Sequence, residues 1–291
     1  MLGTPPAPDA QTEFQILDRR SFGRFLGLED GDNTPDETTI RRFREALVRA
    51  DAIDALFARF DAHLKGLGYP AMGGQIVDAS IIAAPRQRMT GEERAIVKGG
   101  GIPEAWATRP ARLAQKDRNA RWTLKRGRRK KGPDGQLLAE IATPVFGYKS
   151  HIGIDQRHGF IRTWGASDAA RYDGRELPNL IDPANTGSAI WADTAYRSQK
   201  NERAILRAGL VSKIHFRRAP GKPLPAQRQR ANAARSKVRS AVEHVFATPK
   251  QRMGLFIRTI GIERAKAKIG LANIAFNFKR SLCRETRASP A

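Results

Sequence analysis

The sequence predicts an α/β protein, in which a mixed sheet carries helices on its faces and follows a small all-helical region. Three observations lead to this fold class. Apolar residues recur at helical spacing over about the first 70 residues, the period becomes strand-like from residue 73, and the order β–ββ–α–β–α–β–α follows. With 291 residues, 40% of them hydrophobic, the chain can bury one large core or two modest ones.

The first part of the chain predicts short helices. Residues 1–16 are expected to be a disordered stub, because their start is rich in Pro and Ala. A helical region over 17–70 should contain helices at 18–26, 36–48 and 51–65, and Thr34-Pro35-Asp36-Glu37 is a strong helix start. Two amphipathic helices with a short join indicate a helical hairpin or a helix-turn-helix, whose arginines could contact DNA phosphates, and the alternative is a plain helical bundle.

The second part, residues 71–285, predicts the sheet domain. We expect a basic, irregular insert at about 86–140. Strands are predicted at 74–82, 144–154, 160–164, 189–193 and 210–214, and helices at 174–183, 198–208, 235–244 and 263–279.

Charge points to a polyanionic partner. Lys and Arg number 52 against 29 Asp and Glu, which gives a net charge of +23 and a pI of about 11.0. Residues 1–62 hold 8 basic and 12 acidic side chains, so residues 63–291 carry a net +27. The nucleic acid should therefore meet the second part; the alternative is a merely soluble basic protein.

Other classes of protein are disfavoured. No apolar run approaches the roughly 20 residues that span a bilayer, and the N-terminus does not read as a secretory signal. The lone Cys283 cannot form an intrachain disulfide, which fits a reducing cytoplasm. Gly99-Gly100-Gly101 lacks a following Lys-Ser/Thr, so we expect no phosphate loop and no nucleotide cofactor.

Three carboxylates are the candidate catalytic and metal-binding residues. Asp78 lies within the first predicted strand, Asp193 ends a later one, and Glu243 lies on a basic helix where it is the only acid between Glu202 and Glu263. Oxygen ligands of this kind suit Mg²⁺, and two such ions can cleave a phosphodiester. The alternatives are cap or turn acids at Asp78 and Asp193, and an i,i+4 ion pair of Glu243 with Arg239.

The segments around these acids resemble a known family. The motifs are GQIVDAS at 74–80, FGYKSH at 146–151, ADTAYR at 192–197, and Arg239, Glu243 and Lys250 with three and six residues between them. Together they resemble the DDE transposases of bacterial insertion sequences, in the insertion-sequence-four/five branch. Residues 21–28 and 35–40 resemble the helical N-terminal region of that group, and the match runs from about 17 to 278.

The resemblance implies a ribonuclease-H-like catalytic domain and a DNA transposase. Asp78, Asp193 and Glu243 would bind two Mg²⁺ or Mn²⁺ ions, with their carboxylates within about 4–8 Å of one another. The reaction would be hydrolysis at the transposon end, followed by attack of the 3′-hydroxyl on target DNA. The implied partners are double-stranded transposon ends and target DNA, bound by a homodimer, with no membrane involved. The implied location is the bacterial cytoplasm, in association with the nucleoid.

Candidate DNA-binding residues follow from the resemblance and from the basic run at 112–131. They are Lys149, Tyr196, Arg239, Lys250, Arg126, Arg128, Arg129 and Lys130. Trp122, inside the basic run, could stack on a base or make an ordinary core or surface contact.

The chain departs from the family pattern in three respects. Ser236 stands where the family signature has Tyr, Pro249 should end or kink the helix before Lys250, and the family has more helix upstream of Ser21. Two alternatives to an active transposase stay open. One is an inactive, DNA-binding remnant with a truncated end-binding region, and the other is a nuclease of the same fold.

Overall fold

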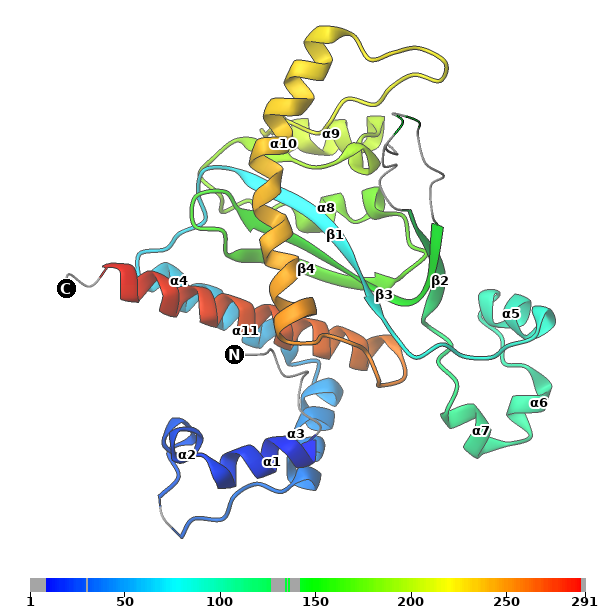
Figure 1. Cartoon of the computed structure of the whole chain (residues 1–291), viewed down its shortest axis with the longest axis vertical. Helices are drawn as coiled ribbons and strands as arrows, with labels where there is room; N and C mark the ends of the chain where they lie inside the picture. The colour runs from blue at the N-terminus through cyan, green and yellow to red at the C-terminus, as the bar shows by residue number, and fades with distance from the viewer. Residues whose placement is uncertain (1–8, 30, 127–133, 135, 137–141, 289–291) are drawn as a thin grey trace.

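The computed structural model describes residues 9–29, 31–126, 134, 136 and 142–288, and it confirms the α/β fold class. A mixed sheet forms the centre. The long helices α10 (Ala226–Ala247) and α11 (Ile262–Ala288) cross one face of it, and α8 (Leu177–Leu180) and α9 (Gln199–Arg207) cover the other (Figure 1).

The sheet combines antiparallel and parallel strands. β1 (Gln75–Ala83) pairs antiparallel with β3 (Ala142–Asp155), which also pairs with β2 (Arg121–Arg126) and β4 (Ile161–Asp168). On its other edge β1 pairs in parallel with β5 (Ala189–Trp191), and β5 with β6 (Val211–Ser212). The order β2-β3-β1-β5-β6, with β4 beside β3, is a ribonuclease-H-like arrangement.

The hydrophobic core lies on both faces of β1, as its apolar neighbours predict. Ile76 faces the α10–α11 side, in a cluster with Val242 and Phe276. Val77 faces the other side, in a cluster with Leu177. A strand covered on both faces is fixed in register, because a shift by one residue would exchange its two faces.

The N-terminal helices are α1 (Asp9–Asp18), α2 (Arg20–Leu26), α3 (Glu37–Arg49) and α4 (Ile53–Gly66). The last three agree with the predicted helices, and the Asp36 side chain caps α3 by accepting a hydrogen bond from the Thr39 amide. The expected disordered stub over 1–16 was wrong for residues 9–16. These residues form most of α1, which packs against α3.

A buried ion network joins the helical region to the sheet. Arg162 on β4 donates to Asp155 at 3.0 Å, to Asp61 of α4 at 2.7 Å and to the Tyr69 carbonyl at 2.7 Å. The Arg162 side chain is 2% exposed and that of Asp155 is not exposed at all. Each charge is therefore compensated inside the protein, and α4 is held beside α11 (Figure 1).

The insert between β1 and β3 is more regular than its sequence predicts. Within its described part it forms α5 (Gly91–Lys98), α6 (Glu104–Ala107), α7 (Pro110–Ala114) and strand β2. The three helices project from one end of the sheet (Figure 1). Helix α5 begins with a capping box, since Thr90 and Glu93 bond each other's backbone amides. The helix predicted at 174–183 is shorter, a 3-10 turn at Asp173–Arg175 followed by α8.

Three asparagine side chains clamp distant backbone segments. Each accepts a hydrogen bond from one residue's amide and donates one to the same residue's carbonyl. Asn277 of α11 holds Ile161 of β4 in this way, at 2.9 and 2.8 Å. Asn185 holds Gly74, and Asn232 of α10 holds Phe216. An amide group therefore takes the place that a neighbouring strand would occupy.

Candidate active site

The register of β1 and β5 brings Asp78 and Asp193 to the same place. Ile76 of β1 lies opposite Trp191, the last residue of β5. Asp78 follows Ile76 by two residues, and Asp193 follows Trp191 by two residues. Side chains two residues apart on a strand share a face, so both are directed to the α10 side. Among the described strands none continues beside β1 at Asp78, which leaves this edge of β1 open.

The Asp78 carboxylate is largely buried and bonded on both oxygens. One oxygen accepts the Ala79 amide at 2.9 Å, and the other accepts Nη2 of Arg239 at 2.9 Å. Burial raises the pKa of Asp78 to about 6; Arg239 opposes this rise, and the nearby Asp193 charge adds to it. The two aspartates are thus close enough to repel each other.

Asp193 is fixed by the turn that it begins. The strand ends at Trp191, and Asp193 caps the 3-10 helix Thr194–Tyr196 by accepting the Ala195 amide at 2.8 Å. It is therefore a cap acid, as the structural alternative predicts, and it also lies beside Asp78. The two interpretations are compatible, since the cap fixes the orientation of the carboxylate.

Glu243 lies on the helix that crosses above this pair. Helix α10 packs on the sheet through the buried Val242 and Val245, and Arg239, one turn before Glu243, reaches Asp78. Glu243 itself is exposed, and in the described part of the chain it has no hydrogen-bond or ion-pair partner. The alternative of an Arg239–Glu243 ion pair is not seen, because Arg239 pairs with Asp78 instead.

The structure therefore brings two of the three predicted carboxylates together and leaves the third on the overlying helix. Over residues 9–29, 31–126 and 142–288, no group of three or more His, Cys, Asp or Glu side chains is arranged to hold a metal ion.

A cavity of about 510 Å³ lies at the C-terminal half of β1, and we call it the lysine pocket. Its charged lining consists of Lys125, Lys149, Lys250 and Asp173. Lys250 belongs to a π-helix (Thr248–Arg252) that follows α10, as Pro249 requires, and its ammonium donates to the Ser80 hydroxyl. Burial, with Lys125 nearby, lowers the pKa of Lys250 to about 8.

Two further predicted DNA contacts have different surroundings. Lys149 borders the lysine pocket, pairs with Asp173 at 2.8 Å and donates to the Arg171 carbonyl. Tyr196 is fully buried in the core on the α8–α9 side, and burial raises the pKa of its hydroxyl well above the usual range. Direct contact of Tyr196 with DNA was thus a wrong prediction for this conformation, because its ring supports the Asp193 turn from inside.

The remaining predicted contacts lie at the end of β2. Arg126 is the last residue of β2, and its side chain is not among the described ones. Arg128, Arg129 and Lys130 lie outside the described residues.

Sequence reasoning missed Asp173, Ser80 and Lys125. Asp173 reads as an ordinary loop acid, and only the fold brings it to Lys149. Ser80 and Lys125 carry a weak signal: Ser80 lies two residues after Asp78 on the same face of β1, and Lys125 belongs to the basic run.

Comparisons with known proteins identify the family of this chain. The family described as "Transposase DDE domain" matches residues 70–278, and "Transposase domain (DUF772)" matches residues 7–46. Since the first match covers more than half of the chain, this protein belongs to the family of transposases with a DDE domain.

A curated relative is similar over much of the chain. The "Transposase for insertion sequence element IS1106" of Neisseria meningitidis serogroup B is 26% identical over 213 residues. That alignment covers 71% of this chain and 65% of the relative, so this chain spans somewhat less than two thirds of the relative's length. No solved structure matches the chain. None of the helices in the described ranges has both the length and the apolar character to cross a membrane.

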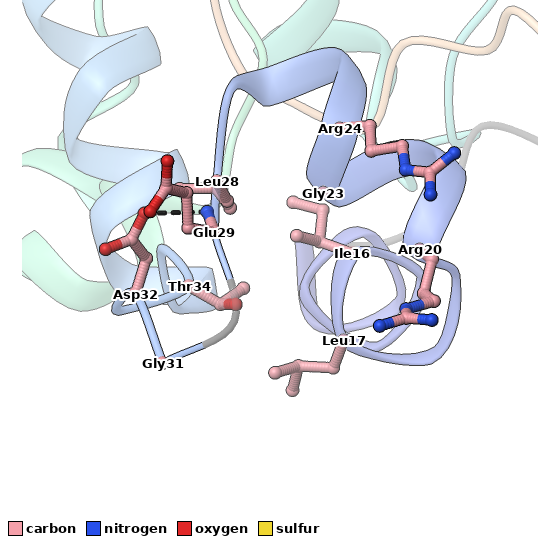
Figure 2. A pocket seen from close by; sticks show the side chains of 10 residues that line it. All are labelled: Ile16, Leu17, Arg20, Gly23, Arg24, Leu28, Glu29, Gly31, Asp32 and Thr34. Atoms are coloured by element: carbon pink, nitrogen blue, oxygen red, sulfur yellow. Dashed lines mark hydrogen bonds between the residues drawn. The ribbon is translucent and has the colours of Figure 1, made fainter.

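A separate pocket lies far along the chain from these residues. It has a volume of about 450 Å³ and is formed by α1, α2 and the loop that follows them (Figure 2). Ile16, Leu17 and Leu28 supply apolar walls, and Arg20 and Arg24 lie on the α2 side. None of the predicted site residues lines this pocket.

Proposed function

We propose that this protein cleaves DNA at the ends of an insertion sequence and joins the freed 3′-hydroxyl to target DNA. Asp78, Asp193 and Glu243 are the proposed catalytic carboxylates. The observation that carries the proposal is the pair of half-buried carboxylates, Asp78 and Asp193, at the open edge of β1, below the basic helix α10. Family membership supports the same reaction class.

The donors at this place fit a divalent cation. The Asp78 carboxylate is desolvated and repelled by Asp193, so its ionised form needs further positive charge, and hard oxygen donors suit Mg²⁺ or Mn²⁺. We propose that Asp78 and Asp193 hold the ions and that Glu243 completes the set when α10 adjusts. Such ions would supply activation of the attacking oxygen and stabilisation of the leaving one.

The chain's own residues would orient the DNA. Arg239 pairs with Asp78, and it would be placed to pair with a phosphate if a cation took over the charge of that carboxylate. Lys125, Lys149 and Lys250 give the lysine pocket a positive lining beside the carboxylates, which suits the backbone of the strand being cut. The partner is double-stranded DNA, and we propose a homodimer in which each copy binds one transposon end.

The test is cleavage of labelled duplex DNA that carries the end of the element. Asp78→Asn and Asp193→Asn should each lower Mg²⁺-dependent nicking by at least about 100-fold, because the ions act on charge that develops only at the reacting phosphate. Gel-shift affinity should stay unchanged, since binding rests on many Lys and Arg contacts.

The matched control is Glu263→Gln, which removes an exposed acid from the first turn of α11 and should leave nicking intact. Nicking by Asp78→Asn at the parent rate would refute the proposed site. Joining of the labelled end to a second DNA separates a transposase from a nuclease of the same fold.

One observation favours a second candidate, a DNA-binding protein that does not cleave. Glu243 has no partner among the described residues, and Arg239 already occupies one oxygen of Asp78. If the parent protein binds DNA with high affinity but never nicks it in Mg²⁺ or Mn²⁺, this second function is the correct one.

A further inference from the structure

A second basic hollow lies beyond the lysine pocket, and we call it the Trp122 cleft. It has a volume of about 1020 Å³ and lies between the chain after β1, helix α5 and the β2–β3 hairpin. The lining residues that bear on its chemistry are Arg86, Arg88, Arg94, Arg112, Glu93 and Trp122. Four guanidinium groups thus face one carboxylate.

The single carboxylate of the cleft is already engaged. Glu93 accepts the Thr90 amide at 2.9 Å and the Trp106 indole at 2.7 Å, and it lies 3.5 Å from Arg112. Over the described residues Arg86, Arg88 and Arg94 have no carboxylate partner. Arg94 donates to the Met89 carbonyl at 3.0 Å, which leaves its charge uncompensated. The charges of all three arginines can therefore be neutralised by a ligand, and guanidinium groups pair well with phosphate.

Trp122 gives this cleft an aromatic wall. Trp122 is 38% exposed, whereas the other three tryptophans are buried or half-buried. Its ring packs on that of Phe146, with centroids 5.4 Å apart, and the Arg86 guanidinium lies 5.9 Å from the ring centre. A partly exposed indole beside guanidinium groups that have no carboxylate partner is the combination that binds unstacked nucleotides, and Arg86 would stay within reach of both the base and its phosphate.

The cleft continues the candidate active site along the sheet. Trp122 lines the cleft, while the next three residues of β2, 123–125, line the lysine pocket. Phe146, opposite Trp122, packs in one cluster with Ile82, which lies on the same face of β1 as Asp78. Strand rise and strand spacing put Trp122 about 20 Å from Asp78.

We propose that the Trp122 cleft binds an unpaired nucleotide of the DNA substrate, with its base stacked on Trp122 and its flanking phosphates held by Arg86, Arg88 and Arg94. At about 3.4 Å per nucleotide in a B-form strand, the bound nucleotide lies roughly six positions from the phosphate at the carboxylates. A base inside a duplex is covered by its neighbours, so only an unstacked base can use the indole face. This inference rests on the proposed function only for the identity of the DNA.

The test compares two DNA probes and does not depend on cleavage. One is a 12-nucleotide single strand carrying 2-aminopurine, and the other is a fully paired duplex of the same sequence. Trp122→Ala should weaken binding to the single strand about 10- to 100-fold, the usual effect of losing one stacked base. Affinity for the duplex should change less than about threefold, and quenching of 2-aminopurine on binding should be lost.

Two controls separate stacking from folding. Trp122→Phe keeps an aromatic ring against Phe146 and should retain most of the single-strand affinity. Arg88→Gln should reduce the slope of log affinity against log salt by about 0.7 on the single strand. Arg207→Gln, an exposed arginine on α9 at the other face of the sheet, should change neither probe's affinity.

The control for folding is that Trp122→Ala and Trp122→Phe unfold at the same temperature. Under that condition, the inference is overturned if Trp122→Ala lowers the affinity for both probes equally, or lowers it for neither. Trp122-dependent binding in a protein that never nicks DNA would leave the cleft established and the proposed function refuted. If nicking depends on Asp78 but Trp122→Ala changes neither probe's affinity, the proposed function is supported and the Trp122 cleft is refuted as a nucleotide site.

Discussion

We expect Lys250 to strengthen DNA binding and to lower the stability of the folded protein. Replacing Lys250 by Met should therefore weaken binding and raise the free energy of unfolding. Its ammonium is partly buried in the lysine pocket, which lowers the pKa of Lys250 from 10.5 to about 8. At about 1.36 kcal/mol per pKa unit, this shift corresponds to roughly 3 kcal/mol of destabilisation at neutral pH. Partial solvation and the lost hydrogen bond to Ser80, worth about 1 kcal/mol, reduce the expected gain of Lys250→Met to about 1–2 kcal/mol.

The sign of the pH dependence follows from which state binds the proton. Between pH 8 and 10.5 the unfolded chain holds the Lys250 proton while the native protein has released it, so this group's contribution to stability rises with pH. Below pH 8 both states are protonated and the cost is fully present. The advantage of Lys250→Met should therefore be largest at pH 7 and should vanish near pH 10.5.

Urea unfolding of the parent and Lys250→Met at pH 7 and pH 10 measures this difference, and gel shifts at pH 7 should show weaker DNA binding by the variant. Lys279→Met, at an exposed position of α11, is the matched control and should change stability little. A variant that is less stable than the parent at pH 7, or an equal difference at both pH values, would refute the reasoning.

Three further predictions concern the site, the charge and the core. Glu243→Gln keeps the size of the side chain and removes its charge, so nicking should fall at least about 100-fold while gel-shift affinity stays the same or rises; equal nicking rates would remove Glu243 from the site. DNA affinity should fall steeply with salt, by about 0.9 in log–log slope for each phosphate neutralised, and a slope near zero in a salt titration would contradict a DNA role for the +27 on residues 63–291. Arg162→Met leaves Asp155 buried without its charge partner and should cost about 3–5 kcal/mol in a denaturant melt, whereas a cost below about 1 kcal/mol would mean that backbone donors suffice for Asp155.

Much of the fold could be predicted from local patterns. The strand-like apolar run at 74–82 predicted each end of β1 to within one residue, and the acids after Thr34 marked the start of α3. Helix α1 was missed because the Pro-rich run before it suggests disorder, whereas the helix is stabilised by packing on α3. Helices α6 and α7 of the insert have only 4 and 5 residues, which is too short for a helical period to be recognised in the sequence.

The candidate site could be predicted in its residue types and only partly in its geometry. Motif spacing identified Asp78 and Asp193, and the strand register accounts for their meeting. The pairing of Arg239 with Asp78 across 161 positions, instead of with Glu243 one turn away, depends on how α10 crosses the sheet. No local rule gives that crossing, because it is set by the burial of Val242 and Val245.

The amide clamp between Asn277 and Ile161 has a consequence for how copies of this protein meet. Strand β4 pairs with β3 on one side, and on the other side both backbone groups of Ile161 are already bonded to a helix. A strand from a second molecule could not extend the sheet at this position without displacing Asn277 and pulling α11 from the face where Phe276 is buried. Self-association by sheet growth is therefore opposed at β4 by the packing of the longest described helix.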